Sequence, residues 1–145
     1  GAATIEALQR ARELGLPIAL DDFGTGYSSL NSLTHLPLKR VKLDRSLIAD
    51  LDTNMRSAAI ARAIVSVCHS LGLEVTVEGV ERIEQLRLLA RTGPIAVQGH
   101  LLSMPIAGDA VPAFAHDSRA RLGMLLAGSA REGDREAVVP FRPRN

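Results

Sequence analysis

The chain has 145 residues, of which 46% are hydrophobic and 23% are charged. Its 17 Lys and Arg against 16 Asp and Glu give a net charge of +1, and this balance excludes the strongly basic composition of a nonspecific nucleic-acid binder. No apolar run approaches the roughly 20 residues of a membrane helix, so the composition indicates a globular domain in water. The single cysteine, Cys68, excludes an internal disulfide and a cysteine-cluster zinc site, and it fits a reducing, cytoplasmic setting.

Apolar residues at helical or strand spacing, bounded by Gly and Pro, predict alternating helices and strands along the chain. The clearest helix has an apolar face from Ile60 to Leu71 and ends at Gly72. The predicted segments are, in order, a helix at 2–14, a strand at 17–20, a short helix before 36, a strand at 41–44, a helix at 56–71, a strand at 74–77, a helix at 81–91, a strand at 95–97 and a helix at 109–126.

Strands that alternate with helices at this spacing indicate βαβ units and a parallel sheet, so the predicted fold class is α/β. The run 17–20 is continuously apolar and ends in two aspartates, which is typical of a strand buried on both faces. Residues 128–145 are rich in Arg, Glu, Gly and Pro, and we expect this tail to be disordered.

Polar side chains stand where the predicted strands end, and in a parallel α/β sheet that edge builds the sites. These residues are Asp21, Asp22, Lys42, Asp44, Glu78 and Gln98. Adjacent aspartates after a strand often cap a helix or form a turn. Two adjacent carboxylates with a third from Glu78 could instead bind one or two hard divalent cations such as Mg²⁺ or Mn²⁺. The local pattern alone leaves both interpretations open.

Lys42 stands between Val41 and Leu43 in a predicted strand, so its side chain points to the face opposite theirs. If Val41 and Leu43 face the helices, the Lys42 ammonium lies on the inner face and requires carboxylate partners there. The glycine pair Gly24 and Gly26 is weak evidence for phosphate binding, because ordinary turns use the same pattern.

Four blocks of sequence resemble the successive signature blocks of the EAL domain family, whose members are bacterial cyclic di-GMP phosphodiesterases. The blocks are IALDDFGTGYSSL from Ile18, VKLDRS from Val41, VEGVE from Val77 and QG from Gln98. The resemblance runs from about residue 2 to residue 105. It implies a TIM-like barrel, of which residues 1–115 form the C-terminal part with about four βα units, while residues 116–145 form a helix end and the tail. The implied reaction is hydrolysis of cyclic di-GMP to linear pGpG.

The resemblance also implies roles for individual residues. Asp21, Asp22 and Glu78 would bind Mg²⁺ or Mn²⁺ in a two-metal site, with Asp21 as the bridge. Lys42, Glu78 and Gln98 would be catalytic, with Lys42 orienting a metal-activated water, and either Lys42 or Glu78 could accept the proton of that water. The substrate and loop residues would be Phe23, Gly24, Thr25, Gly26, Tyr27, Ser28, Asp44 and Glu81. The loop 23–29 could also contribute to a homodimer.

The blocks that supply the other metal ligands in the family are absent: the EAL signature, an asparagine-bearing strand and a glutamate-bearing strand. The chain also begins with Gly, so we expect a piece of a longer protein that needs the N-terminal half of the barrel as its partner and is inactive alone. The alternative is a truncated or degenerate EAL module that binds a partner or nucleotide without turnover. A coincidental aspartate pair in an unrelated α/β hydrolase is a third, less favoured interpretation.

Overall fold

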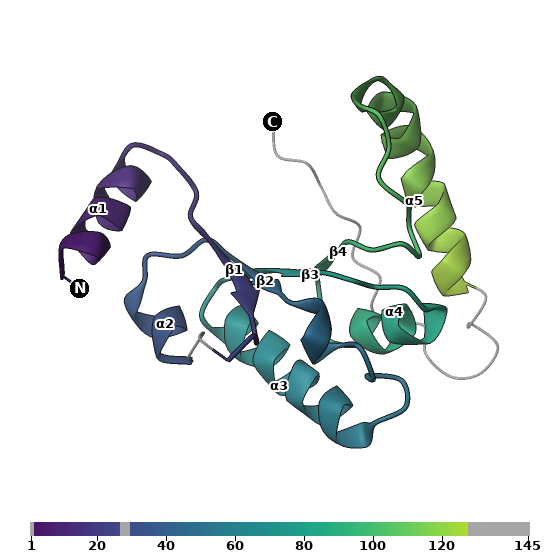
Figure 1. Ribbon diagram of the computed structural model, residues 1–145, viewed down its shortest axis with the longest axis horizontal. Coiled ribbons are helices and arrows are strands. Elements are labelled where there is room, and N and C mark those ends of the chain that lie inside the picture. Colours follow the sequence, from purple (N-terminus) through teal and green to yellow (C-terminus); the bar gives the residue numbers. More distant parts are fainter. Residues whose placement is uncertain (1, 27–29, 128–145) are drawn as a thin grey trace.

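Four parallel strands form one sheet in the order β1-β2-β3-β4 in the computed structural model, which describes residues 2–26 and 30–127. A helix follows each strand, so the predicted α/β alternation is confirmed (Figure 1). The elements are α1 (Ala2–Glu13), β1 (Ala19–Phe23), α2 (Leu30–His35), β2 (Arg40–Leu43), η1 (Arg45–Leu47), α3 (Met55–Ser70), β3 (Glu74–Val77), α4 (Ile83–Ala90), β4 (Ala96–Val97), η2 (Gly108–Ala110) and α5 (Val111–Ala127).

Most predicted boundaries agree with the structure within two residues. The long helix α3 begins one residue earlier than predicted because the Asn54 side chain accepts hydrogen bonds from the backbone N–H groups of Arg56 and Ser57. The last predicted helix is divided, since the 3₁₀ turn η2 precedes α5. The predicted tail at 128–145 and the loop residues 27–29 lie outside the described residues.

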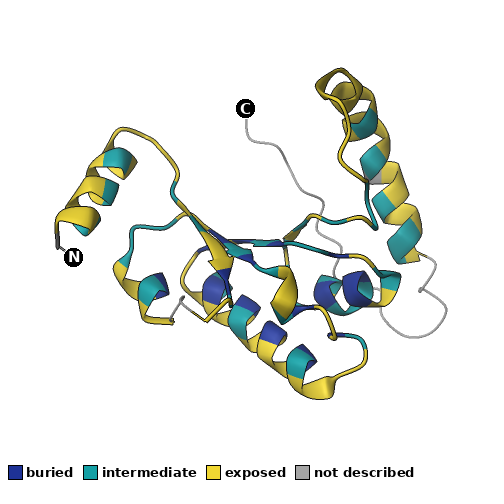
Figure 2. Ribbon diagram, in the orientation of Figure 1, coloured by how far each residue is buried: buried dark blue, intermediate teal, exposed yellow. Residues whose placement is uncertain are grey.

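The hydrophobic core lies between one face of the sheet and the helices α3 and α4 (Figure 2). Alternate residues of β2 and β3 point into it, as the period of two requires. The buried side chains are Val41, Leu43, Val75 and Val77 from the strands, and Ala58, Ala61, Val65, Cys68, Leu86 and Leu89 from the two helices. Because α3 and α4 cover this face of the sheet, the opposite face is the one left for other contacts.

The prediction for the first strand is wrong in two respects. β1 runs from Ala19 to Phe23 rather than over residues 17–20, so it contains both aspartates, and only Phe23 in it is buried. The physical reason is its place in the sheet: β1 is an edge strand that pairs with β2 alone among the described residues. The apolar run therefore indicated a strand correctly, but it could not show that this strand lies at the edge of the sheet and is mostly exposed.

The face of the sheet opposite the core carries the polar side chains. In β3, Glu74 and Thr76 alternate with the buried valines, and Glu78 continues their register just after the strand. Lys42 pairs in register with Thr76 and shares this face, as predicted. In Figure 1, α3 and α4 lie on the other side of the sheet. No helix in the described part of the chain is long and apolar enough to cross a bilayer.

The backbone at Gly99 packs directly against Val80, and we expect Gly99→Ala to destabilise the fold by about 2 kcal/mol or more. A Cβ at position 99 would overlap the backbone nitrogen and carbonyl oxygen of Val80, which cannot rotate away as a side chain can. Those two Val80 atoms also bond to Gln98 and Leu101. Urea unfolding measures the loss.

The matched control is Gly108→Ala, because no atom lies within 4 Å of a Cβ built at position 108. We expect this variant to unfold within about 0.5 kcal/mol of the unaltered chain. Equal stability of the Gly99→Ala and Gly108→Ala variants would contradict the close approach of Gly99 to Val80.

Candidate metal centre

A β-bulge near the end of β1 brings two consecutive aspartates to the same end of the sheet. Leu20 pairs with Val41 and Phe23 pairs with Leu43, so Asp21 and Asp22 together lie opposite Lys42 alone. Adjacent side chains of a regular strand point to opposite faces, whereas a bulge changes the direction of one of them. Asp22 has φ of 52°, a left-handed conformation that Asp tolerates better than most residues, and its N–H donates to Asp21 Oδ1 at 3.1 Å.

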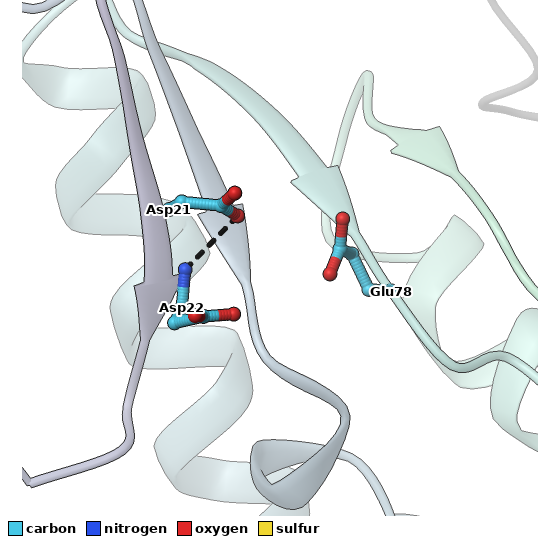
Figure 3. A group of neighbouring side chains, drawn as sticks. All are labelled: Asp21, Asp22 and Glu78. Carbon is cyan, nitrogen blue, oxygen red and sulfur yellow. Dashed lines mark hydrogen bonds between the residues drawn. The ribbon is translucent and has the colours of Figure 1, made fainter.

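Asp21, Asp22 and Glu78 converge from two strands. Each of the three offers a carboxylate oxygen, and these oxygens all lie within 4.8 Å of one another. Figure 3 shows the aspartate pair on β1 and Glu78 beyond the end of β3, on the side of the sheet toward which the aspartates project. Since β1 and β3 are both neighbours of β2, the register of the parallel sheet brings Glu78 close to two aspartates that are 56 and 57 positions before it in the sequence.

The Lys42 ammonium lies between two of these carboxylates. Its Nζ donates to Asp21 Oδ1 at 2.8 Å and forms an ion pair with Glu78 Oε1 at 2.6 Å. The bond to Asp21 and then the bond to Glu78 raise the pKa of Lys42 above its ordinary value, so the amine is protonated at neutral pH. The hydrogen bond from Lys42 in turn lowers the pKa of Asp21. The site therefore already stabilises one positive charge among its carboxylates.

The donor set fits a hard divalent cation. All three ligands are carboxylates, which Mg²⁺ and Mn²⁺ prefer, and the position of the Lys42 ammonium shows that the cluster attracts a cation. The Asp21 side chain is 61% exposed and the Glu78 side chain 22%, so an ion and its waters can reach them. Three carboxylates cannot complete six-fold coordination, and water or further protein ligands must supply the rest.

Three other predicted residues line a cavity of about 860 Å³ that Glu78 also lines. Gln98 follows β4 directly, and its N–H donates to the carbonyl of Val77 beside Glu78. Glu81 is exposed in the segment that joins β3 to α4. Asp44 caps the turn η1, where its carboxylate accepts from the Ser46 N–H at 2.9 Å, and its hydrogen bonds with Ser46 lower its pKa. These residues therefore line the cavity next to Glu78 and are not members of the carboxylate cluster.

The predicted loop residues have different surroundings. Phe23 is 4% exposed and belongs to the core, where its carbonyl accepts from the Asp44 N–H. Thr25 donates through Oγ1 to the carbonyl of Asp22, so the turn after β1 is tied to the second aspartate. Gly24 and Gly26 both have positive φ and form this turn with Thr25. Tyr27 and Ser28 lie outside the described residues.

The sequence analysis missed a buried polar side chain, Gln85, that binds the segment following Glu78. Gln85 is 1% exposed, its Oε1 accepts from the N–H groups of Glu81 and Arg82 at 3.0 Å each, and its Nε2 donates to the carbonyl of Ile48 at 2.9 Å. Gln at the third position of a helix is a known capping signal, so the spacing from Arg82 could have indicated a cap. It could not have indicated the contact with Ile48, 37 residues away.

Arg82 also pairs with Asp52, and this pair leads to a pH prediction. Arg82 Nε donates to Asp52 Oδ2 at 2.7 Å and Nη2 donates to Oδ1 at 2.6 Å. These bonds lower the pKa of Asp52 below its ordinary value of about 3.9. Because the folded-state pKa is the lower one, the stabilisation is present above about pH 4 and is lost as the pH falls through the folded-state value.

We therefore expect Asp52→Asn to lower the melting temperature at neutral pH, and we expect its difference from the unaltered chain to disappear in acid, where Asp52 is protonated. Thermal unfolding followed by circular dichroism over a range of pH measures this. A difference that persists unchanged in strong acid would show that the charge of Asp52 does not stabilise the fold.

Comparison with families and curated proteins gives a consistent result. The family model described as "EAL domain" matches residues 1–105. The cyclic di-GMP phosphodiesterase NbdA of Pseudomonas aeruginosa is 46% identical over 111 residues, which are 77% of this chain and 14% of NbdA. The chain therefore spans a small part of that relative.

Solved structures share the fold. The EAL domain of Mycobacterium smegmatis DcpA superposes with a TM-score of 0.73 at 37% identity, over 79% of this chain and 52% of that one. Klebsiella pneumoniae BlrP1, solved as a manganese/cy-diGMP complex, gives a TM-score of 0.64 at 37% identity, over 69% of this chain and 26% of that one. These EAL structures are TIM-barrel-like, and the four-stranded sheet corresponds to part of that fold.

Proposed function

Since the chain belongs to the EAL domain family, we propose that it supplies the C-terminal part of the active centre of a divalent-metal-dependent cyclic di-GMP phosphodiesterase. The observation that supports this most strongly is the convergence of Asp21, Asp22 and Glu78 at one end of the sheet. The reaction is hydrolysis of one phosphodiester bond of cyclic di-GMP to give linear pGpG. NbdA is named a cyclic di-GMP phosphodiesterase, and BlrP1 was solved as a complex with manganese and cyclic di-GMP.

Each residue of the cluster has a separate task in this proposal. Divalent ions bound at such a centre activate water and neutralise phosphate oxygens. Asp21, Asp22 and Glu78 would hold Mg²⁺ or Mn²⁺ through their carboxylates. We assign Lys42 the role of a hydrogen-bond donor that orients the attacking water, because its ammonium lies between the carboxylates of Asp21 and Glu78. Gln98, which lines the same cavity as Glu78, would help to position the same water.

The chain spans about half of the DcpA EAL domain, and this bears on its own activity. Three carboxylates leave about half of an octahedral coordination shell to other ligands. We therefore propose that turnover requires the part of the barrel that this chain does not cover, whereas weak metal binding does not. A homodimer through the loop 23–29 stays a prediction.

A completed domain tests the proposed function. In it, this chain replaces the matching half of the DcpA EAL domain, and conversion of cyclic di-GMP to pGpG is followed by chromatography with Mn²⁺ or Mg²⁺. We expect metal-dependent turnover by the completed domain and none by the chain alone. Binding of cyclic di-GMP by a folded completed domain without any turnover would instead support a module that binds nucleotide.

A further inference from the structure

The segment 78–82 leaves the sheet with two acidic residues, Glu78 and Glu81, and its backbone is held on both sides. The Glu78 N–H donates to the carbonyl of Leu43 on β2, and the Val80 N–H donates to the carbonyl of Gln98 after β4. The next two N–H groups, of Glu81 and Arg82, have no strand beside them, and the side chain of Gln85 accepts both. Gln85 therefore supplies the hydrogen-bond acceptor that the end of this segment would otherwise lack.

The same side chain joins this segment to the one that follows β2. Gln85 Nε2 donates to the carbonyl of Ile48, and Arg82 Nη2 donates to the carbonyl of Ala49 at 2.6 Å. Arg82 also binds Asp52, whose side chain is 10% exposed. We define the polar junction as Gln85, Arg82 and Asp52. It fixes the position of segment 78–82 relative to segment 48–52, which packs against the core through Ile48 and Leu51.

We propose that the polar junction positions Glu78 for metal binding, with Gln85 as the principal positioning residue; this inference rests on the proposed metal centre. The hydrogen bonds of Gln85 go to backbone groups of Glu81, Arg82, Ile48 and Ala49, so it would act on Glu78 through the backbone that it holds. Glu78 is one residue before Gly79, whose φ of 71° turns the chain, so the direction of the Glu78 side chain depends on where the segment after it is held. Removing partners that orient a metal ligand typically weakens metal binding by 10- to 100-fold.

The test is an NMR titration of the ¹⁵N-labelled chain with Mn²⁺, which broadens amide signals close to the ion even when binding is weak. We expect broadening at Asp21, Asp22 and Glu78 in the unaltered chain. In Gln85→Met, which keeps the length of the side chain but removes its hydrogen bonds, the Mn²⁺ concentration at half-broadening should rise about tenfold.

The control for general loss of stability is Val65→Ala. Val65 is fully buried in α3 on the core face of the sheet and is not a member of the polar junction. Its replacement should lower the melting temperature without shifting the Mn²⁺ midpoint. If Gln85→Met does not fold, Asp52→Asn removes the charged partner of Arg82 in the same junction and should also raise the midpoint, by less than the roughly tenfold expected of Gln85→Met.

The outcomes separate this inference from the proposed function. A higher Mn²⁺ midpoint in the junction variants, with an unchanged Mn²⁺ midpoint in Val65→Ala, supports the positioning role. Broadening at the three carboxylate residues with the same midpoint in all variants overturns the positioning role and leaves the metal centre in place. No broadening at Asp21, Asp22 and Glu78 in the unaltered chain overturns both.

Discussion

Asp21→Asn in the completed domain should reduce the rate of cyclic di-GMP hydrolysis by about 10³-fold, equivalent to about 4 kcal/mol of transition-state stabilisation. The amide has nearly the same shape as the carboxylate but lacks its charge. Asp21 bonds to Lys42 and also belongs to the carboxylate cluster, so its replacement removes one proposed metal ligand and one partner of the ammonium together. The formation of pGpG at saturating Mn²⁺ measures the effect.

The control for Asp21→Asn is Asp109→Asn, an equally conservative change of an exposed carboxylate in η2, outside the cluster. It should leave the rate within about twofold of that of the unaltered completed domain. Undiminished turnover by Asp21→Asn would show that the aspartate pair is not the metal centre and that the acidic bulge of β1 has a purely structural role.

Lys42→Met in the completed domain should separate metal binding from turnover. The Lys42 ammonium competes with a metal ion for Asp21 and Glu78, since it forms ion pairs with both. Its removal should therefore leave Mn²⁺ binding at least as tight as before. Turnover should fall by about 10²-fold, because the attacking water would lose the donor that orients it, and misplacing a reacting group typically costs about this much.

Two measurements check this second prediction: the Mn²⁺ concentration that gives half-maximal binding and the rate at saturating Mn²⁺. The matched control is Lys39→Met, because Lys39 pairs with Glu74 at the opposite end of the same sheet. It should change neither quantity. Weaker Mn²⁺ binding with an unchanged rate in Lys42→Met would contradict the assigned role. It would show that Lys42 only holds the carboxylates in place and takes no part in the reaction.

The local sequence pattern was sufficient to predict strands whose side chains alternate regularly between the core and the opposite face. The strand at Glu74–Val77 was predicted with the correct bounds because its residues alternate between the core and the opposite face. The orientation of Lys42 followed from the same alternation between Val41 and Leu43, which are both fully buried. These predictions needed only the period of a strand.

The bulge and the polar junction could not be predicted in this way. Asp21 and Asp22 come together with Glu78 because β1 carries one extra residue opposite Lys42, and a bulge depends on pairing with another strand. Gln85 reads locally as a helix-capping residue, but its contact with Ile48 follows from the packing of α4 against the segment after β2. The pattern at the strand ends and the resemblance to EAL domains predicted the acidic residues of the candidate site, whereas the polar junction became visible only in the structure.

The central claim is that Asp21, Asp22 and Glu78 bind a catalytic divalent ion, and the most direct measurement is a crystal structure of the completed domain with Mn²⁺, with data collected at the manganese absorption edge. We predict an anomalous difference peak within coordination distance of all three carboxylates, with the Lys42 ammonium displaced from at least one of them. Ordered manganese bound elsewhere in the domain, with the Lys42 ion pairs intact and no peak at the three carboxylates, would contradict the account.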